Sequence, residues 1–140
     1  MKILILHGPN LNLLGKRQPD IYGYETQDEL ITFIKKSFSN INFSFLQSNH
    51  EGVIIDKIHE SIDLIDAIII NPGAFAHYSY AIRDAIAILN IPIIEVHLSD
   101  INNRANFRKQ LVLSEVCNFT ISGKGKNGYI DAVNKIKELI

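Results

Sequence analysis

The fold is decided by residues 65–73, which read Ile-Asp-Ala-Ile-Ile-Ile-Asn-Pro-Gly. The first six residues are the most apolar strand candidate of the chain, and the Asn-Pro-Gly turn signal stops them. A short apolar run that ends in such a signal is typical of a buried strand. We therefore expect a central strand over residues 65–70 and a loop directly after it.

Shorter strands and helices are predicted on both sides of this strand. Strand patterns occur at residues 3–6, 41–47, 92–97 and 118–122. Apolar residues at helical spacing lie at residues 26–39, 51–63, 74–89 and 127–140. Alternating strands and helices are typical of a parallel sheet covered on both faces. We expect an α/β protein with a flavodoxin-like three-layer sandwich, whose five-stranded parallel sheet has the order 2-1-3-4-5.

The helix predicted over residues 74–89 follows the central strand. Its spacing would turn five apolar side chains inward: Ala81, Ile82, Ala85, Ile86 and Leu89. His77 would then lie in the first turn of this helix, at the edge of the sheet.

Length and composition fit a single domain over residues 1–140. Hydrophobic residues make up 46% of the chain and charged residues 21%, as in globular proteins. Fourteen basic and fifteen acidic side chains give a formal charge of −1, which argues against nucleic acid or an anionic membrane as the main partner. The single cysteine, Cys117, excludes an internal disulfide and a cysteine-rich zinc site. No apolar run approaches the ~20 residues that span a bilayer, and we expect a cytoplasmic protein.

The predicted strand order places three loops at one edge of the sheet. In such sheets, ligands bind beyond the carboxyl ends of the strands, at the switch between strands 1 and 3. The loops expected there are residues 7–12, 71–77 and 97–108, which are rich in Asn, His, Ser and Arg. Segments far apart in the sequence should therefore meet in one crevice.

The stretch over residues 8–23 begins in the first loop and carries an arginine five residues before a tyrosine, Arg17 and Tyr22. A guanidinium group about 4 Å from a phenol, at an effective dielectric constant of about 20, stabilises the phenolate by about 4 kcal/mol. Arg17 is therefore the right type of residue to make Tyr22 a base at neutral pH. The alternative is that both are surface loop residues without a chemical role.

The second loop follows the central strand and contains Asn71 and His77. Asn71 can both donate to and accept from a hydroxylated ligand. The alternative is an ordinary turn between a strand and a helix, with His77 as a surface histidine.

The third loop begins at a carboxylate–histidine pair. Glu95 and His97 are two residues apart on a predicted strand, so their side chains share a face. A carboxylate beside a histidine favours the protonated ring, which can act as an acid. The backbone N–H groups of Leu98 and Ser99 could then bind a carboxylate. The alternative is a histidine that merely ends a strand.

Other features give weaker signals. Arg104 and Arg108 lie four residues apart, so a helix there would present both on one face, although a solvated basic patch is the alternative. Metal ligands at the usual spacings are absent from the sequence, and we expect no metal. Residues 123–128, Gly-Lys-Gly-Lys-Asn-Gly, mimic a phosphate loop but follow the last strand, and we interpret them as a turn and helix start.

Taken together, the three motifs resemble those of the type II 3-dehydroquinate dehydratase family. Residues 8–23 are similar to its N-terminal signature, residues 71–84 to its central motif and residues 95–108 to its third motif. Gly128-Tyr129 is similar to the start of its final helix. The resemblance implies a lyase that reversibly dehydrates 3-dehydroquinate to 3-dehydroshikimate through an enolate. It also implies no cofactor and a homododecamer built as a tetramer of trimers.

The resemblance assigns roles to four residues. Tyr22 would be the general base that removes a C2 proton, and Arg17 would promote its ionisation and help stabilise the transition state. Asn10 would position a water that holds the enolate oxygen. His97 would be the acid that protonates the departing C1 hydroxyl.

The resemblance also implies which residues hold the substrate: Asn71, His77, Arg108 and the backbone amides of Leu98 and Ser99. Asp84 lies seven residues after His77, about 10 Å along the predicted helix, which is too far to reach the same site. In the family this aspartate contacts the ligand of a neighbouring subunit.

The chain departs from the family pattern in two places. Residues 99–104 read Ser-Asp-Ile-Asn-Asn-Arg, where the family often has Ser-Asn-Ile-His-Ala-Arg, and Lys109-Gln110 replaces a common His-Ser pair. Both changes spare the expected catalytic residues and bear on subunit contacts and turnover. Asp100 adds a negative charge near the amides expected to bind a carboxylate.

Two other functions are weaker alternatives for this fold. A flavin-binding electron-transfer protein needs a Ser/Thr/Gly-rich phosphate loop after the first strand, where this chain has Pro9, Leu11 and Leu13. A receiver-type interaction module needs an acidic pocket there, where this chain has His7-Gly8.

Overall fold

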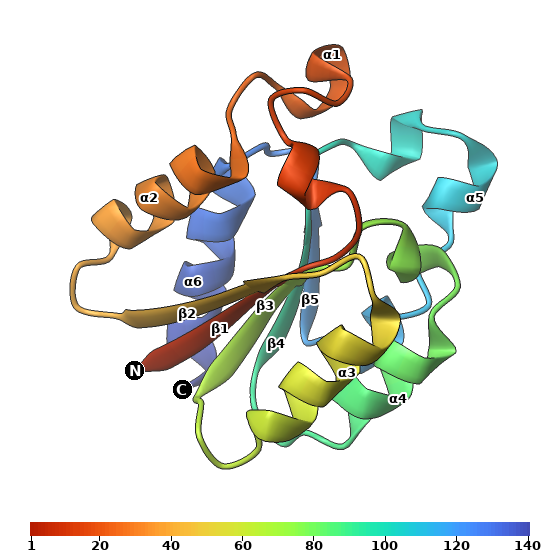
Figure 1. Cartoon of the computed structure of the whole chain (residues 1–140). Helices are drawn as coiled ribbons and strands as arrows, with labels where there is room; N and C mark the ends of the chain where they lie inside the picture. The colour runs from red at the N-terminus through yellow and green to blue at the C-terminus, as the bar shows by residue number, and fades with distance from the viewer.

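A computed structural model describes all 140 residues and contains a five-stranded parallel sheet in the order β2-β1-β3-β4-β5 (Figure 1). The strands are β1 (Lys2–His7), β2 (Asn42–Gln47), β3 (Ala67–Asn71), β4 (Ile93–His97) and β5 (Phe119–Ser122). The helices are α1 (Pro19–Tyr22), α2 (Gln27–Ser37), α3 (Glu51–Glu60), α4 (Tyr80–Ala87), α5 (Asn106–Lys109) and α6 (Asn127–Leu139). Short 3₁₀ turns span Leu11–Leu13, Gly73–His77, Ile101–Asn103 and Ser114–Val116. The predicted fold class and strand order are confirmed.

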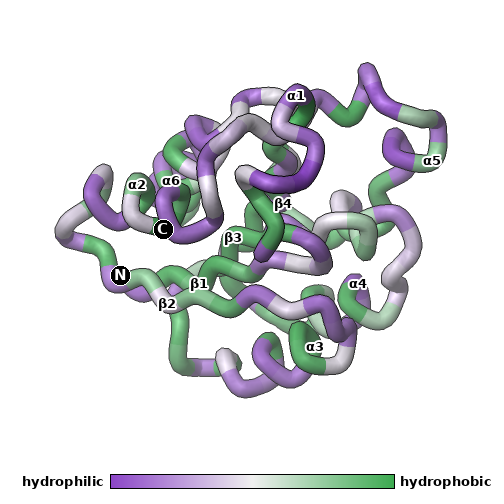
Figure 2. Tube along the Cα trace, turned by 45° about the horizontal axis from the view of Figure 1, so that its top comes forward, coloured by the Kyte–Doolittle hydropathy of each residue, from purple (hydrophilic) through white to green (hydrophobic).

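The sheet separates two hydrophobic layers, with α2 and α6 on one face and α3 and α4 on the other (Figures 1 and 2). Side chains alternate between the layers along each strand: Ile3 and Ile5 pack toward α2 and α6, whereas Leu4 and Leu6 pack toward α3 and α4. Every residue of β3 is buried, as the apolar run predicted. Thr26 starts α2 with a capping box, since its hydroxyl accepts from the N–H of Glu29.

The helix predicted over residues 74–89 is wrong in its first turn. Residues 73–77 form a separate 3₁₀ turn, and α4 begins only at Tyr80, because Ser79 acts as its N-cap and accepts a hydrogen bond from the N–H of Ile82. This shift leaves Ala81 exposed rather than turned inward, while Ile82 is fully buried. His77 therefore does not share a helix with Asp84, and the distance derived from helical spacing does not apply.

Register and close packing bring the loops after β1 and β3 together. His7 pairs with Asn71 across these strands, and the N–H of Gly8 donates to the carbonyl of Asn71 at 2.8 Å. A Cβ atom on Gly8 would lie 2.1 Å from the carbonyl oxygen of Pro72. Only glycine permits this approach, so the first two loops meet at the carboxyl edge of the sheet.

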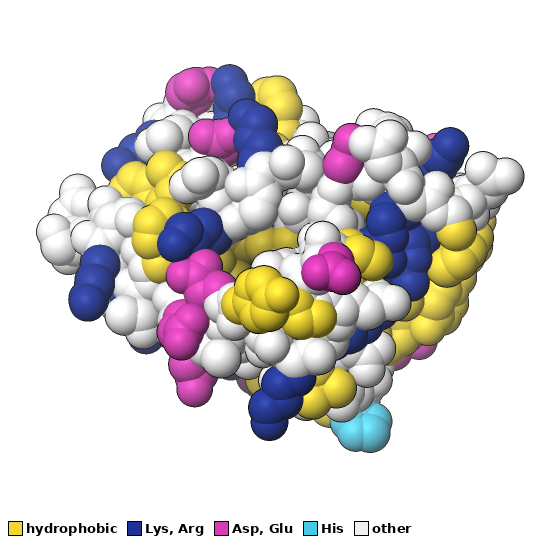
Figure 3. Space-filling model, turned by 90° about the horizontal axis from the view of Figure 1, so that it is seen from above, with side chains coloured by type: hydrophobic (Ala, Val, Ile, Leu, Met, Phe, Trp, Pro, Cys, Tyr) yellow, Lys and Arg dark blue, Asp and Glu magenta, His cyan; other side chains and the backbone are white.

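The surface carries charges of both signs. Seen from above, the molecule shows Lys and Arg side chains as well as Asp and Glu side chains on the same face (Figure 3). None of the helices is long and apolar enough to cross a bilayer.

Candidate active site

A cleft opens at the carboxyl edge of the sheet, where the three predicted loops meet. It is lined by Pro9, Leu11, Arg17, Tyr22, Asn71, Gly73, Ala74, His77, His97, Leu98, Ser99, Ile101, Arg104 and Arg108. Eight of the ten predicted site residues belong to this lining, which comes from all three loops. The exceptions are Asn10 and Asp84. The predicted convergence of distant segments is therefore confirmed.

Tyr22 ends the short helix α1 and lies between two arginines. Arg104 donates from both Nη atoms to the Tyr22 hydroxyl oxygen, at 3.2 Å each. The guanidinium carbon of Arg17 lies 5.0 Å from the centroid of the Tyr22 ring. Arg17 and Tyr22 are thus together, as expected, but Arg17 stacks on the ring whereas Arg104 holds the oxygen. Both cations favour a negative charge on the phenol.

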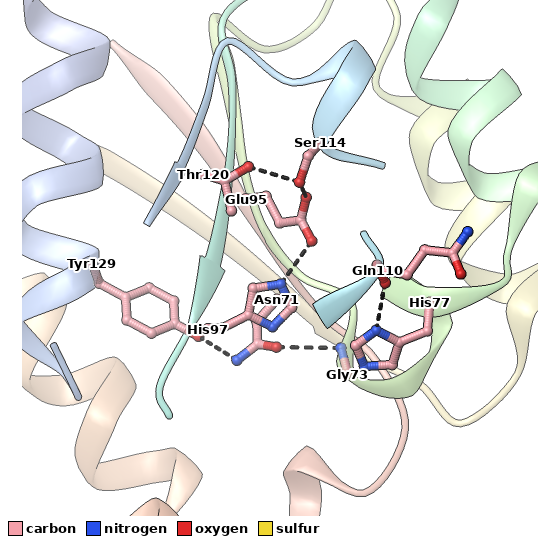
Figure 4. Close-up of polar contacts among 9 residues, drawn as sticks. All are labelled: Asn71, Gly73, His77, Glu95, His97, Gln110, Ser114, Thr120 and Tyr129. Carbon is pink, nitrogen blue, oxygen red and sulfur yellow. Dashed lines mark hydrogen bonds and ion pairs between the residues drawn. The ribbon is translucent and has the colours of Figure 1, made fainter. Parts of the chain in front are cut away.

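His97 ends β4 and forms the predicted pair with Glu95. The Nε2 of His97 lies 2.7 Å from Oε1 of Glu95, and both side chains are buried (Figure 4). Because Glu95 holds Nε2, the other ring nitrogen, Nδ1, is the one left for a ligand in the cleft. The pair can therefore present a proton on Nδ1 to a leaving group.

Asn71 lines the cleft, and hydrogen bonds to Gly73 and Tyr129 fix the orientation of its side-chain amide. Its Oδ1 accepts from the N–H of Gly73 at 3.2 Å, and its Nδ2 donates to the Tyr129 hydroxyl at 3.4 Å (Figure 4). The Tyr129 hydroxyl lies 2.7 Å from Nε2 of His7, whose Nδ1 lies 3.1 Å from Oε1 of Gln27. An amide oxygen only accepts, so Nδ1 of His7 carries the proton and Nε2 accepts from Tyr129.

Burial keeps the side chains of His7 and Tyr129 neutral. It lowers the pKa of His7 from 6.5 to about 4, against a smaller opposing effect of the Gln27 hydrogen bond. Burial also raises the pKa of Tyr129 well above its usual value of 10. Neither group therefore carries charge at neutral pH, and both serve to hold Asn71.

His77 lies on the 3₁₀ turn over residues 73–77, with one ring nitrogen engaged. Its Nδ1 donates to the carbonyl of Gln110 at 2.8 Å, so Nε2 is available to the cleft (Figure 4). Burial is the main cause of a lowered pKa for His77, which favours its neutral form. Because the acceptor is a backbone carbonyl, the unusual side chain at position 110 does not affect this bond.

Three arginines make the cleft positive. Burial is the main cause of a lowered pKa for Arg108, and the charges of Arg104 and Arg17 act in the same direction. Arginine stays protonated at any physiological pH, so these three guanidinium groups remain charged and repel one another. A negatively charged ligand would relieve that repulsion. Arg104 and Arg108 do not share a helix, since Arg104 precedes α5 and Arg108 lies within it.

The loop after β4 is held by the glycine-rich turn before α6. The N–H groups of Gly123 and Gly125 donate to the carbonyls of Ser99 and Leu98 at 3.0 and 3.1 Å. Residues 123–128 do not line the cleft, in agreement with their interpretation as a turn. Their contribution is to position Leu98 and Ser99.

Two predicted site residues lie outside the lining. Asn10 is exposed, has a φ of 68°, and donates its backbone N–H to Asn49. Asp84 has 77% of its side chain exposed and pairs with the neighbouring Arg83 at 3.6 Å. Neither contacts the cleft of its own chain. No group of three or more His, Cys, Asp or Glu side chains is arranged to hold a metal ion.

Comparison with known proteins identifies the family. The family model described as dehydroquinase class II matches residues 1–137. The chain belongs to this family. It is 54% identical to a 3-dehydroquinate dehydratase of Caldicellulosiruptor saccharolyticus over 99% of this chain and 98% of the relative. It is 47% identical to one of Thermotoga maritima, over 99% and 96%.

Solved structures of class II dehydroquinases agree with the fold. The type II dehydroquinase of Butyrivibrio crossotus matches with a TM-score of 0.95 and 50% identity, over 98% of this chain and 97% of that one. The enzyme of Propionibacterium acnes matches with a TM-score of 0.92 and 37% identity, over 97% and 96%.

Sequence reasoning missed two contributions to this dehydroquinase cleft. Arg104 was only one of a basic pair in the sequence, yet it holds the Tyr22 hydroxyl from 82 residues away. Tyr129 matched the family's final helix start but had no assigned task, and it lies under Asn71. Both contacts depend on tertiary packing, which residue spacing does not encode.

Proposed function

We propose that this protein is a 3-dehydroquinate dehydratase, which reversibly dehydrates 3-dehydroquinate to 3-dehydroshikimate in the shikimate pathway. The observation that carries the proposal is that one positive cleft holds both an arginine-bound tyrosine and a carboxylate-paired histidine. Elimination beside a ketone needs a base, a stabiliser for the enolate and an acid. The cleft supplies these types of group within a single dehydroquinase domain over residues 1–140.

Tyr22 is the proposed base. With its oxygen held by Arg104 and its ring stacked on Arg17, it takes the C2 proton of the substrate, and the electron pair moves toward the C3 ketone. The resulting enolate oxygen is held by a water that Asn10 positions. This role for Asn10 requires its exposed side chain to face the bound substrate.

His97 is the proposed acid. As the enolate collapses, the C1–O bond breaks, the C1=C2 double bond forms, and Nδ1 of His97 gives its proton to the departing hydroxyl. Glu95 stabilises the positive ring before this step. The products are water and the enone, after which Tyr22 loses and His97 regains a proton.

The remaining cleft residues would hold the substrate. The cationic Arg108 and the backbone amides of Leu98 and Ser99 suit its carboxylate, and Asn71 and His77 suit its hydroxyl groups. Asp100 lies next to these amides but acts as the cap of the 3₁₀ turn over residues 101–103, where it accepts from the N–H of Asn102 and from the side chain of Asn103.

The substrate test uses the formation of the enone. Purified protein mixed with 3-dehydroquinate should produce the rising ultraviolet absorbance of 3-dehydroshikimate. We propose that the reaction uses no cofactor and no lysine adduct, so activity should survive a chelator and treatment with borohydride in the presence of substrate. No absorbance change with folded protein would contradict the function.

We also propose a homododecamer, built as a tetramer of trimers in the cytoplasm, in which Asp84 contacts the substrate of a neighbouring subunit. Its exposure supports this, as do the half-exposed or more exposed Tyr78, Tyr80 and Ile88 on the same segment, since exposed apolar residues favour an interface. Co-refolding an Asp84→Asn protein with a Tyr22→Phe protein should restore activity in mixed trimers. No recovery in mixed trimers confirmed by mass would contradict the shared site.

A further inference from the structure

Behind the catalytic cleft, the carboxylate of Glu95 is fully buried and uses both oxygens. Oε1 binds Nε2 of His97 at 2.7 Å, and Oε2 accepts from the Ser114 hydroxyl at 2.8 Å (Figure 4). Ser114 in turn accepts from the Thr120 hydroxyl at 2.9 Å. A charged carboxylate inside a protein needs such partners, because an unpaired buried charge is costly.

Tertiary structure explains why these three groups meet. Glu95 and Thr120 are paired in register on the neighbouring strands β4 and β5. Ser114 opens the 3₁₀ turn over residues 114–116, which leads into β5, and the preceding Leu113 is fully buried and anchors that turn. Ser114 is absent from the cleft lining, so it can affect the reaction only through Glu95.

The hydrogen bonds run in one direction. A carboxylate only accepts, so the single hydroxyl proton of Ser114 is committed to Glu95, and Ser114 must accept from Thr120. His97 likewise donates its Nε2 proton to Glu95. Every partner thus donates toward the carboxylate and favours its negative charge.

The other titratable groups near Glu95 do not stabilise the negative charge of its carboxylate. Cys117 follows the 3₁₀ turn over residues 114–116, and burial, together with the charge of Glu95, raises the pKa of its thiol to about 12. His77 faces the pair from the turn over residues 73–77, and burial lowers its pKa. Both are neutral near pH 7, which leaves His97 and Ser114 as the donors that balance the charge.

We propose that Ser114 is a positioning residue for the catalytic acid: its hydroxyl keeps Glu95 ionised and oriented, so that the His97 ring carries its proton on Nε2 and turns Nδ1 to the substrate. This inference rests on the proposed function, because it presumes that His97 is the acid. The alternative role, in which Thr120 and Ser114 pass protons from the surface to His97, does not fit this arrangement. Such a pathway would end at Nε2, which already holds a proton, and not at Nδ1, from which the proton leaves.

The kinetic test compares Ser114→Ala with Ser114→Thr and Thr120→Val. Losing a hydrogen bond to a charged group should lower kcat of Ser114→Ala by about tenfold to a hundredfold, with KM within about threefold. The acid limb of its pH profile should move to higher pH, because Glu95 then takes up a proton more readily. Ser114→Thr should restore kcat, and Thr120→Val should stay near wild type, since it leaves the Ser114–Glu95 bond intact.

A spectroscopic test does not depend on activity. Nitrogen-15 NMR of the His97 ring, above the pH at which it becomes neutral, should show the proton on Nε2 in the wild type and a mixture of both tautomers in Ser114→Ala. Ser114→Cys, with a weak thiol donor of similar size, replaces the alanine variant if that one does not fold. Unchanged tautomers, or a lower kcat with an unmoved acid limb, would overturn the proposal. A tautomer change in an enzyme without dehydratase activity would instead refute the proposed function alone.

Discussion

The buried His7 should make the free energy of unfolding depend on pH between about 6.5 and about 4. Burial lowers its pKa from 6.5 to about 4 in the folded chain. The unfolded chain binds the proton near pH 6.5, whereas the folded chain resists it until about pH 4. The stabilising contribution is therefore complete above pH 6.5 and lost as the pH falls toward 4.

The size of the effect follows from this pKa difference. A tenfold difference in proton affinity is worth about 1.4 kcal/mol, so the full contribution of His7 is about 3 kcal/mol per chain. Between about pH 7 and about pH 5 the loss should be about 2 kcal/mol. The side chain is fully buried, so solvent does not screen the effect.

Urea unfolding at a fixed protein concentration, across this pH range, measures the loss. Other groups also titrate there, so the informative quantity is the difference between wild type and His7→Gln, whose side chain does not titrate. The wild type should lose about 2 kcal/mol more than His7→Gln on going from about pH 7 to about pH 5. His59→Gln, at an exposed position of α3, is the matched control and should behave as wild type. Equal losses in wild type and His7→Gln would refute the reasoning.

Three further outcomes are expected from the contacts described above. Arg104→Gln removes both donors to the Tyr22 oxygen and should lower kcat roughly tenfold to a hundredfold, as measured by steady-state kinetics, while a value within twofold of wild type would contradict that role. Gly8→Ala forces a Cβ against the Pro72 carbonyl and should destabilise the fold by about 3 kcal/mol or more in urea, and an unchanged midpoint would contradict the close approach. Cys117 should resist a thiol reagent at about pH 8 until denaturant is added, since burial raises its pKa to about 12, and rapid labelling of the folded protein would contradict this.

The sheet was predictable because each strand has a local signature. The short apolar run at residues 65–70, stopped by a turn signal, is typical of a buried strand, and the turn residues after it mark the edge where ligands bind. The Glu95–His97 pair was predictable for the same reason, since alternate residues of a strand share a face.

The missed features depend either on one local cap bond or on contacts between separate elements. The break before Tyr80 could not be seen, because the preceding residues have a helical apolar spacing and Ser79 shows itself as an N-cap only when its bond to Ile82 forms. Arg104 and Ser114 gain their positions from loops that pack against elements distant in sequence. Residue spacing finds partners on one element, whereas contacts between elements require the fold.

The central claim is that Tyr22 is the base, and one measurement tests it directly. Tyr22→Phe removes only the phenolic oxygen, and Tyr24→Phe does the same two residues away on a side chain that is 78% exposed. Initial rates of enone formation from 3-dehydroquinate should fall by about 10² to 10⁴-fold in Tyr22→Phe and stay within about twofold of wild type in Tyr24→Phe. A Tyr22→Phe protein that is folded and retains activity within about tenfold of wild type would contradict the account, because another group would then remove the C2 proton.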